Sequence, residues 1–228
     1  MERKATYPDL KINGVGQASG GTYREVRIDG VSRLKGDIEC EKLRLNGMAT
    51  AQGTIRAREL ECDGKLNAVR LLEAGNAVLN GMIKVKGEFR GEKVELNGYI
   101  VVQGDLSAES FHGRGCVEVG GLLNAGEVDL TAEGRCTARE IGGESIRIRR
   151  GTGGSRWRTM WSWAIPKLTA ITEADTIEGD RIDLEHTTAS VVRGSVVHVG
   201  RGCKIGRVEY TEELKVHPEA KVDDQVKV

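Results

Sequence analysis

Residues 43–59 read Leu-Arg-Leu-Asn-Gly-Met-Ala-Thr-Ala-Gln-Gly-Thr-Ile-Arg-Ala-Arg-Glu, and the pattern of this stretch decides the fold. Apolar residues alternate with polar ones in three short runs, and an Asn-Gly or Gln-Gly pair separates one run from the next. Alternation with a period of two predicts β-strand, while glycine and asparagine favour sharp corners. The stretch therefore predicts three short strands joined by two tight corners.

The same pattern recurs along the chain at a nearly constant interval. One apolar column keeps a spacing of 17 residues from position 26 to position 128, and a second inward position follows each member by two residues. Corner glycines recur at a step of 16 and then at steps of 17. The column is Val26, Leu43, Leu60, Ala77, Val94, Phe111 and Val128; the glycines are Gly14, Gly30, Gly47, Gly64, Gly81, Gly98 and Gly115.

Three strands per repeat, closed by glycine corners, predict an all-β fold of the parallel β-helix type, a triangular solenoid with about 17 residues per turn. Successive turns would pair in parallel about 4.8 Å apart, so that equivalent residues stack above one another. The alternative is a meander of hairpins, because Asn-Gly is also a strong hairpin signal. A meander would not hold one register across seven repeats, and the solenoid is the favoured interpretation.

Composition agrees with a stack of thin turns and narrows the function. Aromatic residues are only 4% of the chain and glycines number 31, so a core of Val, Ile, Leu and Ala is expected. Lys plus Arg and Asp plus Glu are 34 each, which argues against a nucleic-acid partner and permits self-association. Five scattered cysteines, no signal peptide and no membrane-length apolar run predict a cytoplasmic protein with free thiols.

The repeat divides the chain into four parts. Residues 1–8 form a short lead, residues 9–148 form the β-helix, and residues 149–167 interrupt it with an insertion rich in arginine and tryptophan. Residues 168–228 return to the inward pattern, as Ile182 with Leu184 illustrates. They are interpreted as a continuation of the same β-helix, with a second separate stack as the alternative.

The insertion is the strongest local anomaly, because it holds all three tryptophans of the chain. Arginine with tryptophan suits an anionic membrane interface, and exposed tryptophan also suits a pocket of a partner protein. The third alternative is a loop that folds back and covers a flank of the coil. The residues proposed for membrane or partner contact are Arg149, Arg150, Arg156, Trp157, Arg158, Met160, Trp161 and Trp163.

No pattern predicts catalysis, a cofactor or a metal site. The four histidines share no column, and the acidic residues alternate outward, as expected of a solvated face. Enzymes built on hexapeptide repeats show a six-residue periodicity, which a 17-residue repeat lacks. The cysteines at inward positions, Cys40 and Cys62, are expected to pack as small apolar residues. We therefore expect no catalytic, cofactor-binding or metal-binding residues and no enzymatic activity.

The ends of the coil predict self-association. A parallel stack leaves unpaired backbone groups on its first and last turns, and soluble solenoids usually cover them with a polar cap or a helix. Neither end of this sequence shows helical periodicity. The polymer interface is therefore predicted at the end turns, with Leu10 and Ile12 on one and Leu214 and Val216 on the other.

The 17-residue turns, such as residues 43–59, and the half-turn Gly104-Asp105-Leu106-Ser107-Ala108-Glu109 resemble those of bactofilins, polymer-forming cytoskeletal proteins of bacteria. The resemblance covers most of residues 9–148 and, more loosely, residues 168–222. It implies a right-handed coil, nucleotide-independent end-to-end assembly into non-polar filaments, and scaffolding of cell shape, motility or partner localisation. This chain departs from the family pattern by its Trp-rich insertion and by the absence of a long Pro-rich tail and of the family's membrane-binding peptide.

Two functions follow from these observations. The first is a cytoplasmic scaffold whose partner is a second copy of itself, with the membrane surface or other scaffold proteins as further partners. The second is a non-polymerising, membrane-associated adaptor that uses the Trp-rich insertion.

Overall fold

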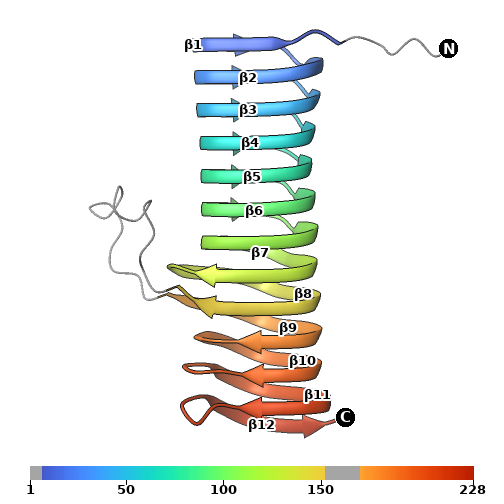
Figure 1. Cartoon of the computed structure of the whole chain (residues 1–228), viewed down its shortest axis with the longest axis vertical. Coiled ribbons are helices and arrows are strands. Elements are labelled where there is room, and N and C mark those ends of the chain that lie inside the picture. The colour runs from blue at the N-terminus through green and yellow to red at the C-terminus, as the bar shows by residue number, and fades with distance from the viewer. Residues whose placement is uncertain (1–6, 152–169) are drawn as a thin grey trace, which may run out of the picture.

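The computed structural model describes residues 7–151 and 170–228, and in these residues all regular structure is β. Twelve strands form one sheet in chain order, each paired with the next (Figure 1). Their bounds are β1 Leu10–Ala18, β2 Gly21–Leu34, β3 Ile38–Ala51, β4 Ile55–Ala68, β5 Leu72–Val85, β6 Phe89–Val102, β7 Leu106–Ala132, β8 Arg135–Arg150, β9 Ile171–Leu184, β10 Thr187–Val199, β11 Lys204–Val216 and β12 Lys221–Lys227.

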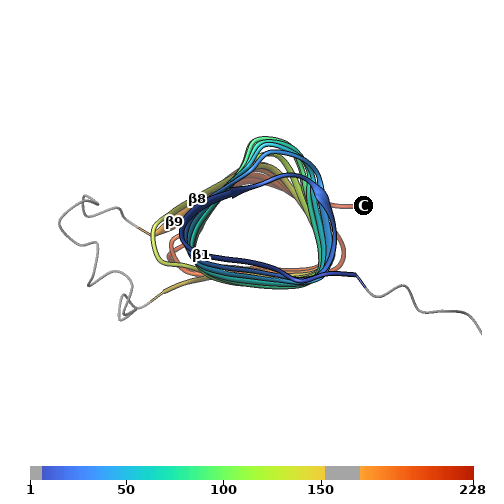
Figure 2. The ribbon, with the colours of Figure 1, turned by 90° about the horizontal axis from the view of Figure 1, so that it is seen from above.

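The sheet coils into a solenoid with a triangular cross-section (Figure 2). Each strand bends around corners and runs along three sides of the triangle. Strand β3 begins on a third side with Ile38 and Cys40. The first side carries Leu43 and Leu45, and the second side carries Ala49 and Ala51. Strand β4 then begins with Ile55 on the third side, and it continues along the first side of the following turn. The predicted all-β, triangular parallel β-helix is confirmed.

All pairings between the described strands are parallel, which excludes the hairpin meander. Leu10 lies beside Val26, a step of 16, and every pairing from β2 to β7 has a step of 17. The step then varies: Val128 pairs with Ile146, a step of 18, and Ile182 pairs with Val197, a step of 15. The first half of the coil is thus more regular than the second.

The core is one continuous column of inward side chains along the axis. Val, Ile, Leu and Ala supply most of it, and in the strands between the two end turns most inward residues are almost completely buried. The two phenylalanines of the chain, Phe89 and Phe111, are both fully buried. The narrow lumen explains the composition, because three sides with two inward residues each leave room for aliphatic layers and few large rings.

The ladder continues across the predicted insertion. Strand β8 runs on to Arg150 and β9 begins at Ile171, with Ile146 paired to Ile182 across a step of 36. Residues 171–228 therefore extend the same sheet, and the interruption begins after Arg150 rather than at residue 149. Arg149 and Arg150 are strand residues because they pair with Thr131 and Ala132.

Seven glycines line the corner between the first and second sides, here called the glycine corner. All seven have positive φ and stand one per turn: Gly14, Gly30, Gly47, Gly64, Gly81, Gly98 and Gly115. A side chain at Gly81 would place its Cβ 2.1 Å from the carbonyl oxygen of Gly64 in the preceding turn. At this corner the backbones approach so closely that only hydrogen fits.

Two glycine variants separate the backbone conformation from the close approach. Gly81→Ala has positive φ and a backbone clash, whereas Gly14→Ala has positive φ and no atom within 4 Å of the added Cβ. We expect Gly14→Ala to lower the free energy of unfolding by about 1–2 kcal/mol, the cost of a left-handed L-residue. Gly81→Ala should cost at least about 4 kcal/mol or prevent folding, because backbone must move. Equal decreases in the free energy of urea unfolding for the two variants would show that the close approach between turns at Gly81 adds no cost, which would contradict this account.

Candidate self-association site

The first turn presents an outer backbone edge and a thin apolar layer. Strand β1 pairs with β2 and, among the described residues, with no other strand. Its inward residues are Leu10, which is half-buried, and Ile12, which is 8% exposed, whereas Val26 and Ile28 directly beneath them are fully buried. The first turn thus covers the core below it while its own apolar side chains have a neighbour on one side only.

The other two sides of the first turn carry small inward residues and one tyrosine. Gly16 and Ala18 occupy the second side, and Gly21 and Tyr23 occupy the third. The Tyr23 hydroxyl donates to the Ser19 carbonyl oxygen at 3.5 Å, and its ring lies about where a Gly21 side chain would point. The tyrosine therefore lies across the end of the third side, and the whole edge is apolar or glycine at its inward positions.

The last turn is apolar on two sides and polar on the third. Strand β12 covers Lys204–Tyr210 of β11, so Leu214 and Val216 lie beyond it on the first side, and Val216 is 37% exposed. On the third side the inward positions are Gln225 and Lys227, which stack beneath Val208 and Tyr210. The two ends of the solenoid therefore differ in chemistry.

The four residues predicted at the polymer interface lie at the two ends of the same side. Leu10 and Ile12 begin the first-side columns that continue through Val26 and Ile28, and Leu214 and Val216 are the last members of those columns. The whole stack separates the two pairs within one chain. A direct contact between them requires two copies.

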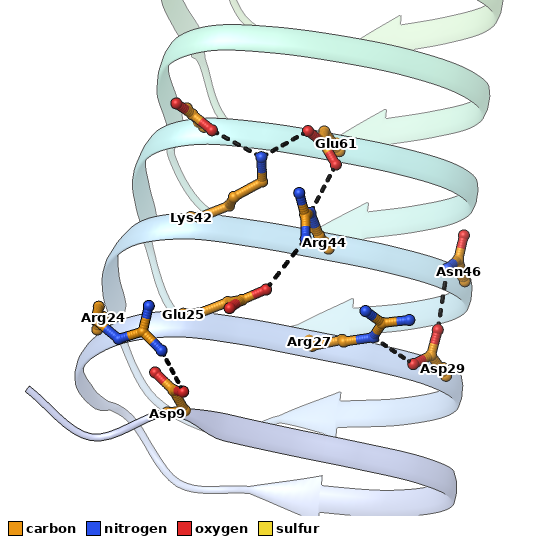
Figure 3. Close-up of polar contacts among 10 residues, drawn as sticks. Asp9, Arg24, Glu25, Arg27, Asp29, Lys42, Arg44, Asn46 and Glu61 are labelled. Carbon is orange, nitrogen blue, oxygen red and sulfur yellow. Dashed lines mark hydrogen bonds and ion pairs between the residues drawn. The ribbon is translucent and has the colours of Figure 1, made fainter.

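Ion pairs between successive turns line the outside of the stack near its N-terminal end (Figure 3). Arg44 lies between Glu25, at 3.5 Å, and Glu61, at 2.9 Å. Lys42 contacts Glu59 and Glu61 at 2.8 Å each. The hydrogen bond from Lys42 holds the pKa of Glu61 below its ordinary value, and Glu59 raises the pKa of Lys42. Such exposed pairs add little stability singly, but they favour correct register between turns.

A column of asparagine and aspartate runs beside the glycine corner. The amide of Asn46 donates to Asp29 at 3.0 Å, Asn80 donates to Asp63 at 2.9 Å, and Asn97 donates to Asn80 at 3.2 Å. Asn13 occupies this column in the first turn, directly beside Asp29. The column thus reaches the edge with an amide that can donate to or accept from a second copy.

The structure describes only part of the proposed membrane or partner contact. Arg149 donates to both carboxylate oxygens of Asp129 at 2.9 Å, and Arg150 is the last residue of β8. These two arginines belong to the coil. The remaining six residues, Arg156, Trp157, Arg158, Met160, Trp161 and Trp163, lie outside the described residues.

The cysteines behave as packing residues. All five are free, four of them are buried, and Cys116 is partly exposed. Burial raises the pKa of the Cys62 thiol to about 12 and that of Cys116 to about 11. Within residues 7–151 and 170–228, no cluster of three or more His, Cys, Asp or Glu side chains could hold a metal ion. The same residues contain no helix long and apolar enough to cross a membrane.

Thiol chemistry checks this burial. At pH 8 we expect a thiol reagent to modify Cys116 first and the other four cysteines only after unfolding, because buried thiols stay protonated. The raised pKa values also imply that the stabilisation from protonated thiols is complete below about pH 9 and is lost as pH rises toward 12. Mass spectrometry of partially labelled protein gives the order of reaction. Rapid modification of all five cysteines in the native protein would contradict the inward placement.

The geometry defines the chain as a β-solenoid with an apolar first edge, a mixed last edge and register-setting ion pairs along its sides. No family model matches the sequence. The chain is similar to two uncharacterized proteins of Bacillus subtilis strain 168: YhbF, 37% identical over 108 residues, and YhbE, 35% identical over 108 residues. Each match covers 47% of this chain and 42% or 43% of the relative, so the chain spans less than half the length of these relatives. No solved structure matches.

Proposed function

We propose that this chain is a self-assembling scaffold whose copies stack end to end into filaments without nucleotide, as bactofilins do. The observation that carries the proposal is that, within residues 7–151 and 170–228, β1 pairs with β2 alone, at an edge whose inward positions are apolar or glycine. An exposed strand edge is a template for another strand, and the main-chain hydrogen bonds supply affinity. A second copy offers the matching triangular outline, with apolar inward residues on all three sides of its first turn and on two sides of its last turn.

The remainder of the stack suits a passive structural role. Its sides are tied by hydrogen bonds and ion pairs between turns, which stiffen a rod built of similar layers. The proposed role is to organise cell shape, motility or the position of partner proteins in the cytoplasm. Other scaffold proteins and the membrane surface are the further partners proposed, and no catalytic activity is proposed.

Charges introduced at the end turns test the assembly. We expect the wild-type protein to form thin filaments in negative-stain electron microscopy without nucleotide. Leu10→Glu with Ile12→Glu should abolish them, because two carboxylates would be buried at the junction at a cost of several kcal/mol each. The matched control is Thr50→Glu with Asn67→Glu, which adds the same two charges at outward positions of the second side in β3 and β4, away from both end turns. This control should still assemble.

Charging the other end gives the polarity of assembly. If junctions join the first turn of one copy to the last turn of the next, Leu214→Glu with Val216→Glu should leave monomers. If like ends join, the same variant should leave dimers in sedimentation velocity. Circular dichroism and thermal unfolding confirm that each variant is folded. Monodisperse wild-type monomers at all concentrations would overturn the scaffold and leave the adaptor that uses the Trp-rich segment.

A further inference from the structure

One side of the triangle carries cations and apolar residues but no acids. The second side of β2–β6 has three outward columns, which start at Val31, Arg33 and Lys35 and repeat every 17 residues. Of these 15 positions, five hold Lys or Arg, six hold Val, Met or Tyr, and none holds Asp or Glu. We call this surface the cationic face, and its charged residues are Arg33, Lys35, Lys65, Lys84 and Lys86.

The other two sides of the same turns mix both signs of charge. On the first side Lys42 and Arg44 share Glu61, and on the third side Arg56 pairs with Glu73 at 3.1 Å. By contrast, none of the five cations of the cationic face forms an ion pair or a side-chain hydrogen bond with another described residue. Positive charge is therefore concentrated and unpaired on one side of a chain whose net charge is zero.

The acidic residues at the borders of the cationic face are engaged elsewhere. Asp37, at the corner with the third side, accepts a hydrogen bond from the Thr54 amide at 2.7 Å. Glu88, at the same corner, pairs with Arg90 at 2.6 Å. Neither carboxylate neutralises the cations beside it.

Apolar side chains lie exposed among these cations. Val31 is 42% exposed, Met48 48% and Val69 40%, and each belongs to one of the three outward columns. Exposed apolar side chains that gather on one surface mark an interaction site, because water is a poor environment for them. The cationic face thus combines the two properties of a surface that binds an anionic, partly apolar partner.

We propose that the cationic face of β2–β6 lies against the surface of an anionic lipid bilayer. The lysines and Arg33 would contact the lipid phosphates, and Val31, Met48 and Val69 would enter the boundary between headgroups and acyl chains. The inference deepens the proposed function, which names the membrane surface as a further partner, and it assigns the face of the scaffold that meets the membrane.

The shape of the face suits a bilayer. It is one side of the triangular outline (Figure 2), about 19 Å along the axis across five strands and about 13 Å wide across five residues. Four of its five cations are exposed. A lipid surface needs no fixed register with its partner, and long flexible lysines can each reach a headgroup.

A nucleic acid fits the same face less well. Sequence-tolerant binding of single strands uses aromatic side chains on which bases stack. Tyr99 is the one aromatic residue in the three columns, and its hydroxyl donates to Glu118 at 2.8 Å in the adjoining turn. The apolar residues are instead Val and Met, which suit acyl chains better than bases.

End-to-end stacking would leave the cationic face free, because the face lies on a side of the rod. A filament would present one such face per copy, so that many weak contacts add up to firm attachment. Single copies are expected to bind the same surface more weakly.

Flotation with lipid vesicles tests the face. We expect the full chain to float with vesicles that contain phosphatidylglycerol, to bind pure phosphatidylcholine at least about tenfold more weakly, and to be released by salt. Lys84→Glu with Lys86→Glu should weaken binding at least about tenfold, because two attractions become repulsions. The matched control is Arg58→Glu with Lys93→Glu, an equal charge change at exposed, unpaired cations outside the face, which should bind nearly as wild type does.

The apolar part of the face has its own variant. Met48→Ser with Val69→Ser should weaken binding by about threefold and leave its salt dependence unchanged, because the binding strength also scales with buried apolar area. Circular dichroism confirms that each variant is folded.

Two further variants separate this inference from the proposed self-assembly. Thr50→Glu with Asn67→Glu adds two carboxylates to the cationic face, and it should form filaments but bind vesicles weakly. Leu10→Glu with Ile12→Glu leaves the face intact, and it should form no filaments but still bind vesicles. Wild-type filaments without vesicle binding would overturn this inference and leave the scaffold in place.

Two other outcomes would overturn the inference. Vesicle binding that survives Lys84→Glu with Lys86→Glu but is lost when Trp157, Trp161 and Trp163 are changed to serine would assign the membrane contact to the Trp-rich segment. Lateral association of copies that depends on Lys84 and Lys86, without flotation, would assign the cationic face to an acidic surface of a second copy.

Discussion

The parallel hydrogen-bond ladder between successive turns is the interaction on which the rest of this structure depends. Each turn alone has six inward side chains and cannot exclude water from them. Stacking at the spacing of parallel strands closes the core from above and below and pairs most backbone groups within the coil. Among the described residues, β1 and β12 each pair with a strand on one side only, and the proposed assembly is built on these two edges.

The ladder dictates which residues the corners accept. At the glycine corner the carbonyl of one turn lies where the Cβ of the next would be, as Gly64 and Gly81 show. Polar side chains on the outer surface also link successive turns, since Asn80 donates to Asp63 and Arg44 donates to Glu61 in the adjoining turn. The 17-residue repeat of the sequence thus reflects contacts between successive turns, because each residue packs against or bonds to the residues one turn away.

The sequence was sufficient to predict the inward columns and the glycine corner, because both obey local rules of alternation and positive φ. It was less informative in the second half of the coil, where the step between paired residues varies between 15 and 19, as Ile182 with Val197 and Val119 with Ala138 show. The position of Arg149 and Arg150 in β8 was missed, since two consecutive arginines before Gly151 break the alternation that predicts strand. The exposed apolar residues that follow corner glycines, such as Val15, Val31 and Met48, were missed as a group, because only the pairing of the strands shows that they share a column. Near the C-terminal end, Leu214 pairs with Val197 in its first-side column, whereas the inward positions of Gln225 and Lys227 follow only from the pairing of β12 with β11.

The central claim is that copies meet at the outer edges of β1 and β12. Hydrogen exchange measured as a function of protein concentration tests this claim most directly. End-to-end stacking predicts that amides of residues 10–18 and 221–227 gain protection as concentration rises, while residues 55–102 in the middle of the stack exchange at an unchanged rate. Particle mass that rises without added protection at either end, or with added protection along the sides of the middle turns, would contradict the account.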